Sequence, residues 1–404
     1  MTKAFSRIRH DRMRKVMTAH LNEGGIPGLV TLISHGGDEH VEAIGNQDLE
    51  SGVPMQRDTI FRIASMTKPI TAVAAMTLVE EYRLRLDDPV DRLLPELAER
   101  KVLRSLDGPI DDTVPSNRPL TLRDLMTFTS GYGIVMAPPG TYPIQQAIAD
   151  LSLEPGPPHP ASDPPPDEWM RRLGTLPLLH QPGARWLYNT GSDILGVLIA
   201  RASGMGFGEF LRDCIFTPLG MVDTGFFVPS EKTDRLATSY EANADSGNLS
   251  VFDRASGGQW SAPPAFESGA GGLVSTADDL LAFGQMLLAK GVMRDGQERI
   301  LSRPSVELMM TDQLTPPQKA ASVPDKDIFA LDGWGFGAEV TTRRTSLSST
   351  PGQYGWAGGL GTSWAIDPIE NLTGMLLTQV TMGSPSATAA MSDFWTTTYA
   401  ALED

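Results

Sequence analysis

The chain is poor in cysteine, in positive charge and in long apolar runs. Cys214 is the only cysteine among 404 residues, which excludes an intramolecular disulfide and a cysteine-rich metal site. The 33 basic residues are outnumbered by 49 acidic ones, and the resulting net charge of −16 would repel nucleic acid and anionic membrane surfaces. The longest apolar run, Ile70 to Val79, contains two threonines and is too short to cross a bilayer. We therefore expect a globular protein without nucleic-acid or membrane partners.

The N-terminal residues do not have the pattern of a secretory signal. Basic residues are frequent among the first fifteen, but no apolar segment follows them. A cytoplasmic location is the expectation. The hydrophobic content of 41% supplies a core large enough for two lobes, or for one lobe with a large insertion.

Two common hydrolase signatures are also missing. No Gly-x-Ser-x-Gly sequence occurs, and the histidines have neither metal-ligand spacing nor a convincing catalytic partner. A Ser-His-Asp hydrolase and a zinc hydrolase are therefore disfavoured, and we expect no metal and no organic cofactor. The six histidines are His10, His20, His35, His40, His159 and His180.

What is present is a serine and a lysine one helical turn apart, in Ser65-Met66-Thr67-Lys68. The pattern places both side chains on one face at the start of a helix, and an alcohol beside a readily deprotonated amine is an activated nucleophile. Chance alone predicts about 0.6 such matches in a chain with 29 serines and 8 lysines, so this single match proves little without its context. Pro69 cannot donate a hydrogen bond to the Ser65 carbonyl, which predicts a tight or irregular turn there.

Strand patterns gather at both ends of the chain, and helix patterns fill the middle. The sequence predicts a mixed α and β fold: one antiparallel sheet built from both termini, flanked by helices, with a mainly helical lobe inserted in it. We expect a single catalytic domain, residues 1–404, with a sheet lobe of residues 1–63 and 333–404, a helical lobe of residues 64–332, and a catalytic cleft between them. The predicted strands are Leu29–Ser34, His40–Ile44, Thr59–Ile63, Trp334–Thr341, Tyr354–Ile366 and Leu372–Thr381, and the predicted helices include Leu120–Phe128, Ser192–Ala202, Phe207–Ile215, Thr276–Ala289 and Ser386–Ala401.

A proline-rich insertion, residues 137–168, interrupts the helical lobe. Ten of the 31 prolines fall between Pro138 and Pro166, so neither a long helix nor a central strand can form there. The segment is either a wall or lid of a pocket or a passive surface loop.

Without a histidine base, Lys68 or a tyrosine must take the proton from Ser65. Burial and the positive end of the helix dipole would both favour the neutral form of Lys68. A nearby ammonium would favour a phenolate, and among the seven tyrosines Tyr188 is the candidate.

These motifs, in this order, resemble the serine β-lactamase and penicillin-binding-protein superfamily, most closely the class C β-lactamase-like carboxylesterases called family VIII esterases. The resemblance covers nearly the whole chain. It lies in Phe61-Arg62-Ile63-Ala64-Ser65-Met66-Thr67-Lys68-Pro69, Leu120–Gly131, Pro182–Gly191 with its Tyr188-Asn189-Thr190, Pro218–Met221, Gly271–Asp279 and Trp356-Ala357-Gly358-Gly359-Leu360-Gly361-Thr362.

The resemblance implies roles for four residues. Ser65 would be the acyl-accepting nucleophile, Lys68 its activating partner, and Tyr188 the group that moves protons to the leaving group and from the deacylating water. The backbone N–H groups of Ser65 and Gly359 would form the oxyanion hole. A lysine, a phenol and an alcohol that share hydrogen bonds would titrate as a coupled set.

Two departures from the β-lactamase pattern bear on the substrate. Where those enzymes have Tyr-x-Asn this chain has Tyr188-Asn189-Thr190, and where they have Lys-Thr-Gly it has Trp356-Ala357-Gly358. The cation that would pair with a penicillin carboxylate is missing, and a tryptophan offers apolar area instead. Trp356 and Gly358 are candidate substrate contacts; Trp356 could also be a core aromatic.

Two further positions have two interpretations each. Asn189 is a candidate substrate contact or the cap of a helix that begins near Ser192. Tyr132 lines the cleft or fills a turn.

The sequence thus predicts a serine carboxylesterase that hydrolyses small, short-chain acyl esters through an acyl-enzyme, with weak β-lactamase activity possible. The alternatives are a β-lactamase, a D-aminopeptidase or an acyltransferase of the same fold, and a catalytically silent homologue that binds an acyl ligand. The sequence leaves the oligomeric state open.

Overall fold

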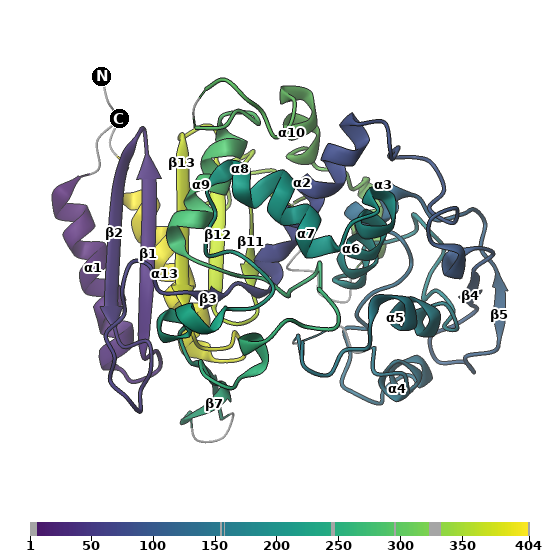
Figure 1. Ribbon diagram of the computed structural model, residues 1–404, viewed down its shortest axis with the longest axis horizontal. Coiled ribbons are helices and arrows are strands. Elements are labelled where there is room, and N and C mark those ends of the chain that lie inside the picture. Colours follow the sequence, from purple (N-terminus) through teal and green to yellow (C-terminus); the bar gives the residue numbers. More distant parts are fainter. Residues whose placement is uncertain are drawn as a thin grey trace.

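The computed structural model describes residues 6–153, 156, 158–243, 247–294, 296–322 and 333–402. Its central feature is a seven-stranded antiparallel sheet in the order β2-β1-β13-β12-β11-β10-β9, to which both ends of the chain contribute (Figure 1). The strands are β1 (Gly28–His35), β2 (Asp38–Gly45), β9 (Gly333–Trp334), β10 (Glu339–Val340), β11 (Tyr354–Gly358), β12 (Thr362–Asp367) and β13 (Leu372–Thr378).

The join between the two chain ends is the pairing of β1 with β13. Leu29 lies opposite Thr378 and His35 opposite Leu372, in an unbroken register. β1 also pairs with β2 through a hairpin whose Gly36 and Gly37 have positive φ angles of 60° and 99°, as the glycines in that turn predicted. The antiparallel sheet built from both termini is confirmed.

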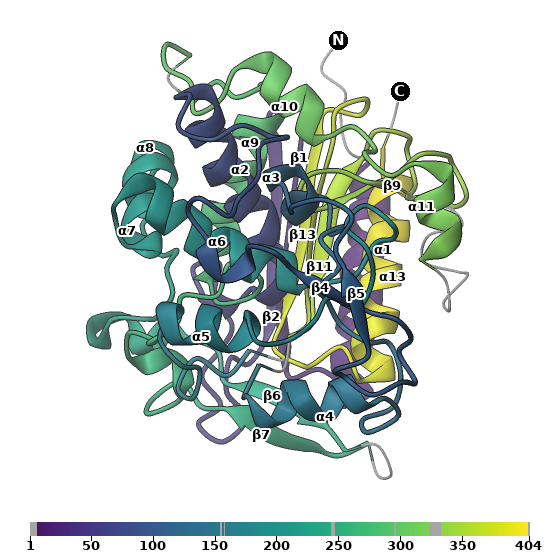
Figure 2. The same cartoon turned by 90° about the vertical axis from the view of Figure 1, so that its right-hand side faces the viewer.

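Helices cover both faces of this sheet. α1 (Arg7–Asn22) and α13 (Pro385–Ala400) lie on one face and α9 (Ala277–Leu288) on the other (Figure 2). Successive β1 residues therefore face different cores: Leu29 and Ile33 pack with α1 and α13, whereas Val30 and Leu32 belong to the large core beneath α9. A sheet buried on both faces explains the continuous apolar run in β1.

The strand expected at Thr59–Ile63 is shorter and lies elsewhere. Only β3 (Phe61–Arg62) is a strand, and it pairs with β8 (Val274–Ser275) instead of joining the main sheet. The backbone of Ile63 also bonds to the residue before β8, because its N–H donates to the Leu273 carbonyl at 3.0 Å. The apolar pattern of this segment therefore reflects burial under the sheet lobe and not membership of the sheet.

Two other expected strands are each divided. The segment 334–341 forms part of β9 and all of β10, and the segment 354–366 is the β11–β12 hairpin, which turns at Gly361 with a φ of 95°. A period-two pattern continues across such a tight turn, so it does not reveal the break.

The helical lobe is organised around α2 (Thr67–Glu80), in which twelve of fourteen residues are buried. α6 (Thr190–Ser203) packs against α2 and against α3 (Leu122–Met126). The other described strands and α-helices are β4 (Lys101–Leu103), β5 (Thr113–Pro115), α4 (Pro143–Asp150), α5 (Pro166–Leu173), α7 (Phe207–Leu211), α8 (Thr217–Leu219), β6 (Ser239–Ala242), β7 (Leu249–Asp253), α10 (Arg303–Met309) and α11 (Pro316–Ala321).

Within the described ranges, no single helix is long and apolar enough to cross a membrane. The helical segments Thr190–Ser203 and Phe207–Leu219 reach the required length and composition only when taken together, and they are bent by 78° relative to each other.

Candidate active site

Ser65 lies at the entrance to α2 on a strained turn. The preceding Ala64 has a φ of 44°, a left-handed conformation that costs free energy for a residue with a Cβ. Residues Ala64–Met66 form a 3₁₀ turn that runs directly into α2. The irregular turn predicted from Pro69 is therefore present, and it leaves Ser65 half-buried at the edge of a cavity.

Lys68 is entirely buried one turn later, and its amine is hydrogen-bonded to the serine. Its Nζ donates to Ser65 Oγ at 2.9 Å and to the Ala270 carbonyl at 2.6 Å. A buried ammonium needs such acceptors because it has lost its hydration. The helical spacing thus brings the two groups together as expected.

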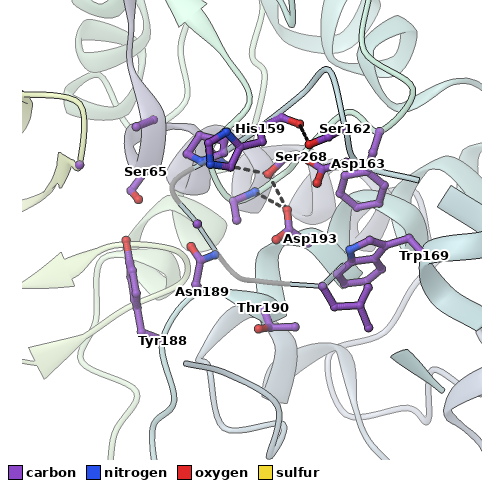
Figure 3. A pocket seen from close by; sticks show the side chains of 18 of the residues that line it. Ser65, His159, Ser162, Asp163, Trp169, Tyr188, Asn189, Thr190, Asp193 and Ser268 are labelled. Carbon is purple, nitrogen blue, oxygen red and sulfur yellow. Dashed lines mark hydrogen bonds between the residues drawn. The ribbon is translucent and has the colours of Figure 1, made fainter. Parts of the chain in front are cut away.

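Tyr188 reaches the same place from the start of α6. Its backbone carbonyl accepts from Ile134 N–H at 2.9 Å, and the next residue, Asn189, has a φ of 87° that turns the chain into the helix. The Lys68 Nζ lies 4.6 Å from the centre of the Tyr188 ring. Figure 3 shows the Ser65 hydroxyl and the Tyr188 phenol pointing toward one another.

The phenol oxygen of Tyr188 accepts a hydrogen bond from Trp356. The indole Nε1 of Trp356 donates to Tyr188 Oη at 2.7 Å, and its ring lies edge-on to Trp334 with the centroids 4.7 Å apart. Trp356 is not among the described residues that line the cavity beside Ser65. The structure therefore gives Trp356 a contact with Tyr188, and a contact between Trp356 and the substrate stays a prediction.

The two glycines after Trp356 have different surroundings. Gly358 ends β11, where a Cβ would collide with the Ile63 carbonyl and the Thr362 hydroxyl, so only glycine fits. Gly359 lines the cavity beside Ser65, and a Cβ there would meet no atom within 4 Å. Its carbonyl accepts from Met382 N–H at 2.9 Å. The expected pair of oxyanion donors, Ser65 and Gly359, thus borders one cavity.

That cavity has a volume of about 310 Å³ and is lined by both polar and apolar side chains. The aromatic rings of Trp169 and Phe266, which both line it, stack with their centroids 5.0 Å apart. The proline-rich insertion supplies a wall, so it is not a passive surface loop. The insertion residues that line the cavity are Ser152, Leu153, Gly156, Pro158, His159, Ser162 and Asp163.

Two of the other candidate contacts differ in placement. Asn189 lines the cavity; it occupies the N-cap position of α6, but its side chain makes no capping hydrogen bond. Tyr132 is buried in the core, where its hydroxyl donates to the Leu176 carbonyl at 3.4 Å. Burial raises the pKa of the Tyr132 phenol. Of the two interpretations for Tyr132, the structure favours the filled turn.

Sequence reasoning missed Asp193, which lines the same cavity from the first turn of α6. Its Oδ1 accepts from Ser268 Oγ at 2.6 Å and from Ala270 N–H at 3.1 Å. Burial raises the pKa of Asp193, and the charge of Lys68 opposes that rise. Acidic residues are ordinary in the first turn of a helix, so nothing in the pattern marked this one.

The part of the chain that the structure describes contains no group of three or more His, Cys, Asp or Glu side chains that could hold a metal ion. Of the histidines, His159 lines the cavity, and its Nδ1 lies 3.4 Å from the Gln259 side-chain amide.

One protein family matches most of the chain. Residues 13–392 match the Beta-lactamase family. The chain belongs to this family.

Relatives and solved structures agree with this membership. Protein Rv1367c of Mycobacterium tuberculosis is 40% identical over 350 residues, 84% of this chain and 82% of that protein. Esterase EstB of Burkholderia gladioli is 30% identical over 91% of this chain and 89% of its own length. The structure of EstCE1, described as a hydrolase with promiscuous acyltransferase activity, superposes with a TM-score of 0.77 at 25% identity, covering 97% of this chain and 98% of that one.

These findings establish the coarse class. The protein is a serine hydrolase of the β-lactamase fold whose relatives and structural neighbours include esterases and acyltransferases. The penicillin-binding-protein-like resemblance inferred from the motifs is confirmed, as is the mixed fold.

Proposed function

We propose that the protein is a carboxylesterase that hydrolyses small, short-chain acyl esters through an acyl-enzyme on Ser65. The observation that carries this proposal is the 2.9 Å hydrogen bond from the buried Lys68 amine to Ser65 Oγ, at the edge of a cavity that the Tyr188 phenol also borders. A nucleophile bonded to a potential base beside a substrate-sized cavity is the arrangement that acyl transfer requires.

The proposed reaction has two halves. Ser65 Oγ attacks the ester carbonyl, its proton passes through the Lys68–Tyr188 pair to the leaving alkoxide, and the alcohol departs. Water then attacks the acyl-enzyme carbonyl while Tyr188 accepts its proton; the C–Oγ bond breaks, and the proton returns to Ser65 as the acid leaves. In both halves the negative oxygen would accept hydrogen bonds from the N–H groups of Ser65 and Gly359.

The charge of the cavity supports a neutral ester over a β-lactam. Its described lining contains the carboxylates Asp163 and Asp193 but neither an arginine nor a lysine side chain. A penicillin carboxylate would meet like charges there, and at the position of the β-lactamase lysine Trp356 hydrogen-bonds Tyr188 instead. The wall of Trp169 and Phe266 suits an apolar acyl or alcohol group.

Acyl transfer to an alcohol is the second candidate, favoured by the match to EstCE1. It uses the same acyl-enzyme with an alcohol in place of water. Product analysis with p-nitrophenyl butyrate and an added primary alcohol distinguishes the two, because transfer yields a new ester whereas hydrolysis yields butyrate.

The proposed nucleophile is tested by mass spectrometry and by kinetics. A fluorophosphonate should add once per chain, and peptide mapping should place the adduct on Ser65. Ser65→Ala should lose the adduct and lower kcat/KM for p-nitrophenyl butyrate by about 10³-fold or more. Ser203→Ala, whose hydroxyl donates within its own helix to the Ala200 carbonyl, is the control and should keep both. Wild-type hydrolysis by Ser65→Ala would show that the serine assignment is wrong; no hydrolysis by the wild type would indicate a silent homologue.

The substrate class is tested separately. The kcat/KM for p-nitrophenyl acetate and butyrate should exceed that for nitrocefin, and a larger value for nitrocefin would assign a β-lactamase. A cytoplasmic location is part of the proposal, and fractionation of cells that produce the full chain tests it.

A further inference from the structure

Asp193 is a buried acid that the proposed reaction does not use. Its residue is 8% exposed, and its Oδ1 accepts hydrogen bonds from the Ser268 hydroxyl at 2.6 Å and the Ala270 N–H at 3.1 Å. Ala270 has a second role, since its carbonyl accepts from Lys68 Nζ at 2.6 Å. A single residue thus joins the buried acid to the buried amine.

The segment around Ala270 is wedged between two helices. A Cβ on Gly269 would collide with the Ser192 carbonyl of α6 and lie 3.2 Å from Thr71 Cγ2 of α2. The Thr71 hydroxyl donates to the Gly269 carbonyl at 2.9 Å. The Gly271 N–H donates to Ser268 Oγ at 3.1 Å, so the hydroxyl that Asp193 binds also shapes the turn. The position of the Ala270 carbonyl therefore depends on contacts from both helices.

We propose that Asp193 is a positioning residue for proton transfer: it holds residues 268–271 so that the Ala270 carbonyl receives the Lys68 amine. The inference depends on the proposed esterase function, because it assigns Lys68 a part in moving protons. An amine that donates to both Ala270 and Ser65 is kept in place for proton transfer between Ser65 and the Lys68–Tyr188 pair.

The surroundings of Asp193 support this assignment. It shares its cavity with the Tyr188 phenol and with His159 and Asp163 of the insertion. Burial raises the pKa of Asp193, while the Ser268 hydrogen bond and the charge of Lys68 act in the opposite direction. The hydrogen bonds to Ser268 and Ala270 therefore tie the buried acid to the segment that receives Lys68.

The test separates the charge of Asp193 from its hydrogen bonds. Asp193→Asn keeps an oxygen acceptor and removes the charge, whereas Asp193→Ala removes both. We measure kcat and KM for p-nitrophenyl butyrate from pH 5 to 10, with thermal unfolding to establish that each variant is folded. Asp193→Asn should keep kcat within about threefold of the wild type, because its amide oxygen can still accept from the Ser268 hydroxyl and the Ala270 N–H. Asp193→Ala should lower kcat by about 10- to 100-fold with little change in KM.

Two matched variants keep the inference falsifiable. Asp163→Ala removes a carboxylate from the same cavity, and its kcat should fall less than that of Asp193→Ala; an equal fall would assign the effect to the net charge of the cavity and overturn the proposal. Ser268→Ala keeps the Asp193 carboxyl and removes the hydroxyl that joins it to Gly271, so kcat should fall several-fold. It also replaces the Asp193 variants if those do not fold, and wild-type kcat in Ser268→Ala would overturn the positioning role.

Two negative results have different meanings. An Asp193→Ala profile that superposes on the wild type would overturn the role of Asp193 while leaving the esterase proposal intact. Absence of ester hydrolysis and of fluorophosphonate labelling in the wild-type protein would instead overturn the proposed function itself.

Discussion

Two fully buried cations flank Ser65 in the sequence, Arg62 three residues before it and Lys68 three residues after it. Arg62 is saturated with partners: it donates to Asp253 through Nε at 2.8 Å, to the Ala237 carbonyl at 2.5 Å, and lies over the Trp260 ring at 5.3 Å. Lys68 has no carboxylate within salt-bridge distance in the part of the chain that is described, and bonds a hydroxyl and a carbonyl. A cation fixed by a carboxylate serves the fold, whereas one bonded to neutral groups remains available for proton transfer.

The largest expected effect in this comparison is the loss of activity in Lys68→Met. The change removes the group that bonds Ser65 Oγ, so kcat/KM for p-nitrophenyl butyrate should fall by about 10²- to 10⁴-fold. The free energy of unfolding should change by less than about 2 kcal/mol, because a buried charge disappears and one carbonyl loses its donor. A variant that keeps more than a tenth of the activity would show that Lys68 is another structural cation.

For Arg62→Met we expect the main loss in stability and not in activity. Removing one partner of a buried ion pair leaves Asp253 uncompensated, and urea denaturation should show a loss of about 3–5 kcal/mol in the free energy of unfolding. Adding Asp253→Leu should recover part of the loss, since no unpaired charge then remains. Wild-type stability in Arg62→Met would contradict the structural role.

Trp356 and Trp334 allow a comparison between a hydrogen-bonded indole and one without a described partner. Trp356→Phe keeps a ring but removes the N–H that bonds the Tyr188 phenol, which should lower kcat/KM by about tenfold, the value of one hydrogen bond to a developing phenolate. Trp334→Phe is the matched control: its Nε1 is buried without a partner among the described residues, so a smaller loss is expected. Equal losses in the two variants would mean that ring packing matters and the hydrogen bond does not.

The smallest expected effect is on stability and concerns the buried carboxyl group of Asp279. Burial raises the pKa of Asp279 from 3.8 to about 6, although Thr224 and the Asp223 N–H donate to it. Because the folded pKa lies above the unfolded one, its contribution to stability is complete below pH 4 and lost as the pH rises through 6. From pH 5 to 8 the wild type should therefore lose roughly 1 kcal/mol more of its unfolding free energy than Asp279→Asn does. Urea denaturation would contradict this prediction if the unfolding free energies of the wild type and Asp279→Asn changed equally with pH.

Much of the fold could be predicted because its signals are local. The glycine hairpin between β1 and β2, the alternating strands at both chain ends and the serine–lysine spacing are all properties of short segments. Phe61–Arg62 shows the limit: its residues have the same apolar character as sheet strands, and the pairing with Val274–Ser275 that takes it out of the sheet comes from more than two hundred residues away.

For the site, the order of motifs pointed to Ser65, Lys68, Tyr188 and Gly359, all of which the structure places around one cavity or, for Lys68, directly beneath it. The pattern could not distinguish an indole that lines a cavity from one that donates to a phenol, nor a core tyrosine from a cleft tyrosine, as Trp356 and Tyr132 show. Asp193 carried no signal, because its hydrogen bonds are to residues 268–270, which lie far from it in the sequence.

The amino-acid sequence by itself determined the serine and lysine on one helical turn, the glycines of the tight turns and the strands available at both ends. Those features depend on backbone geometry over a few residues. Only the tertiary structure decided that the buried Lys68 lacks a direct ion pair while Arg62 has one, and that Ala270 links Lys68 to Asp193. Hydrogen-bond partners in a low-dielectric interior are set by which segments meet there, and that information is not carried by local pattern.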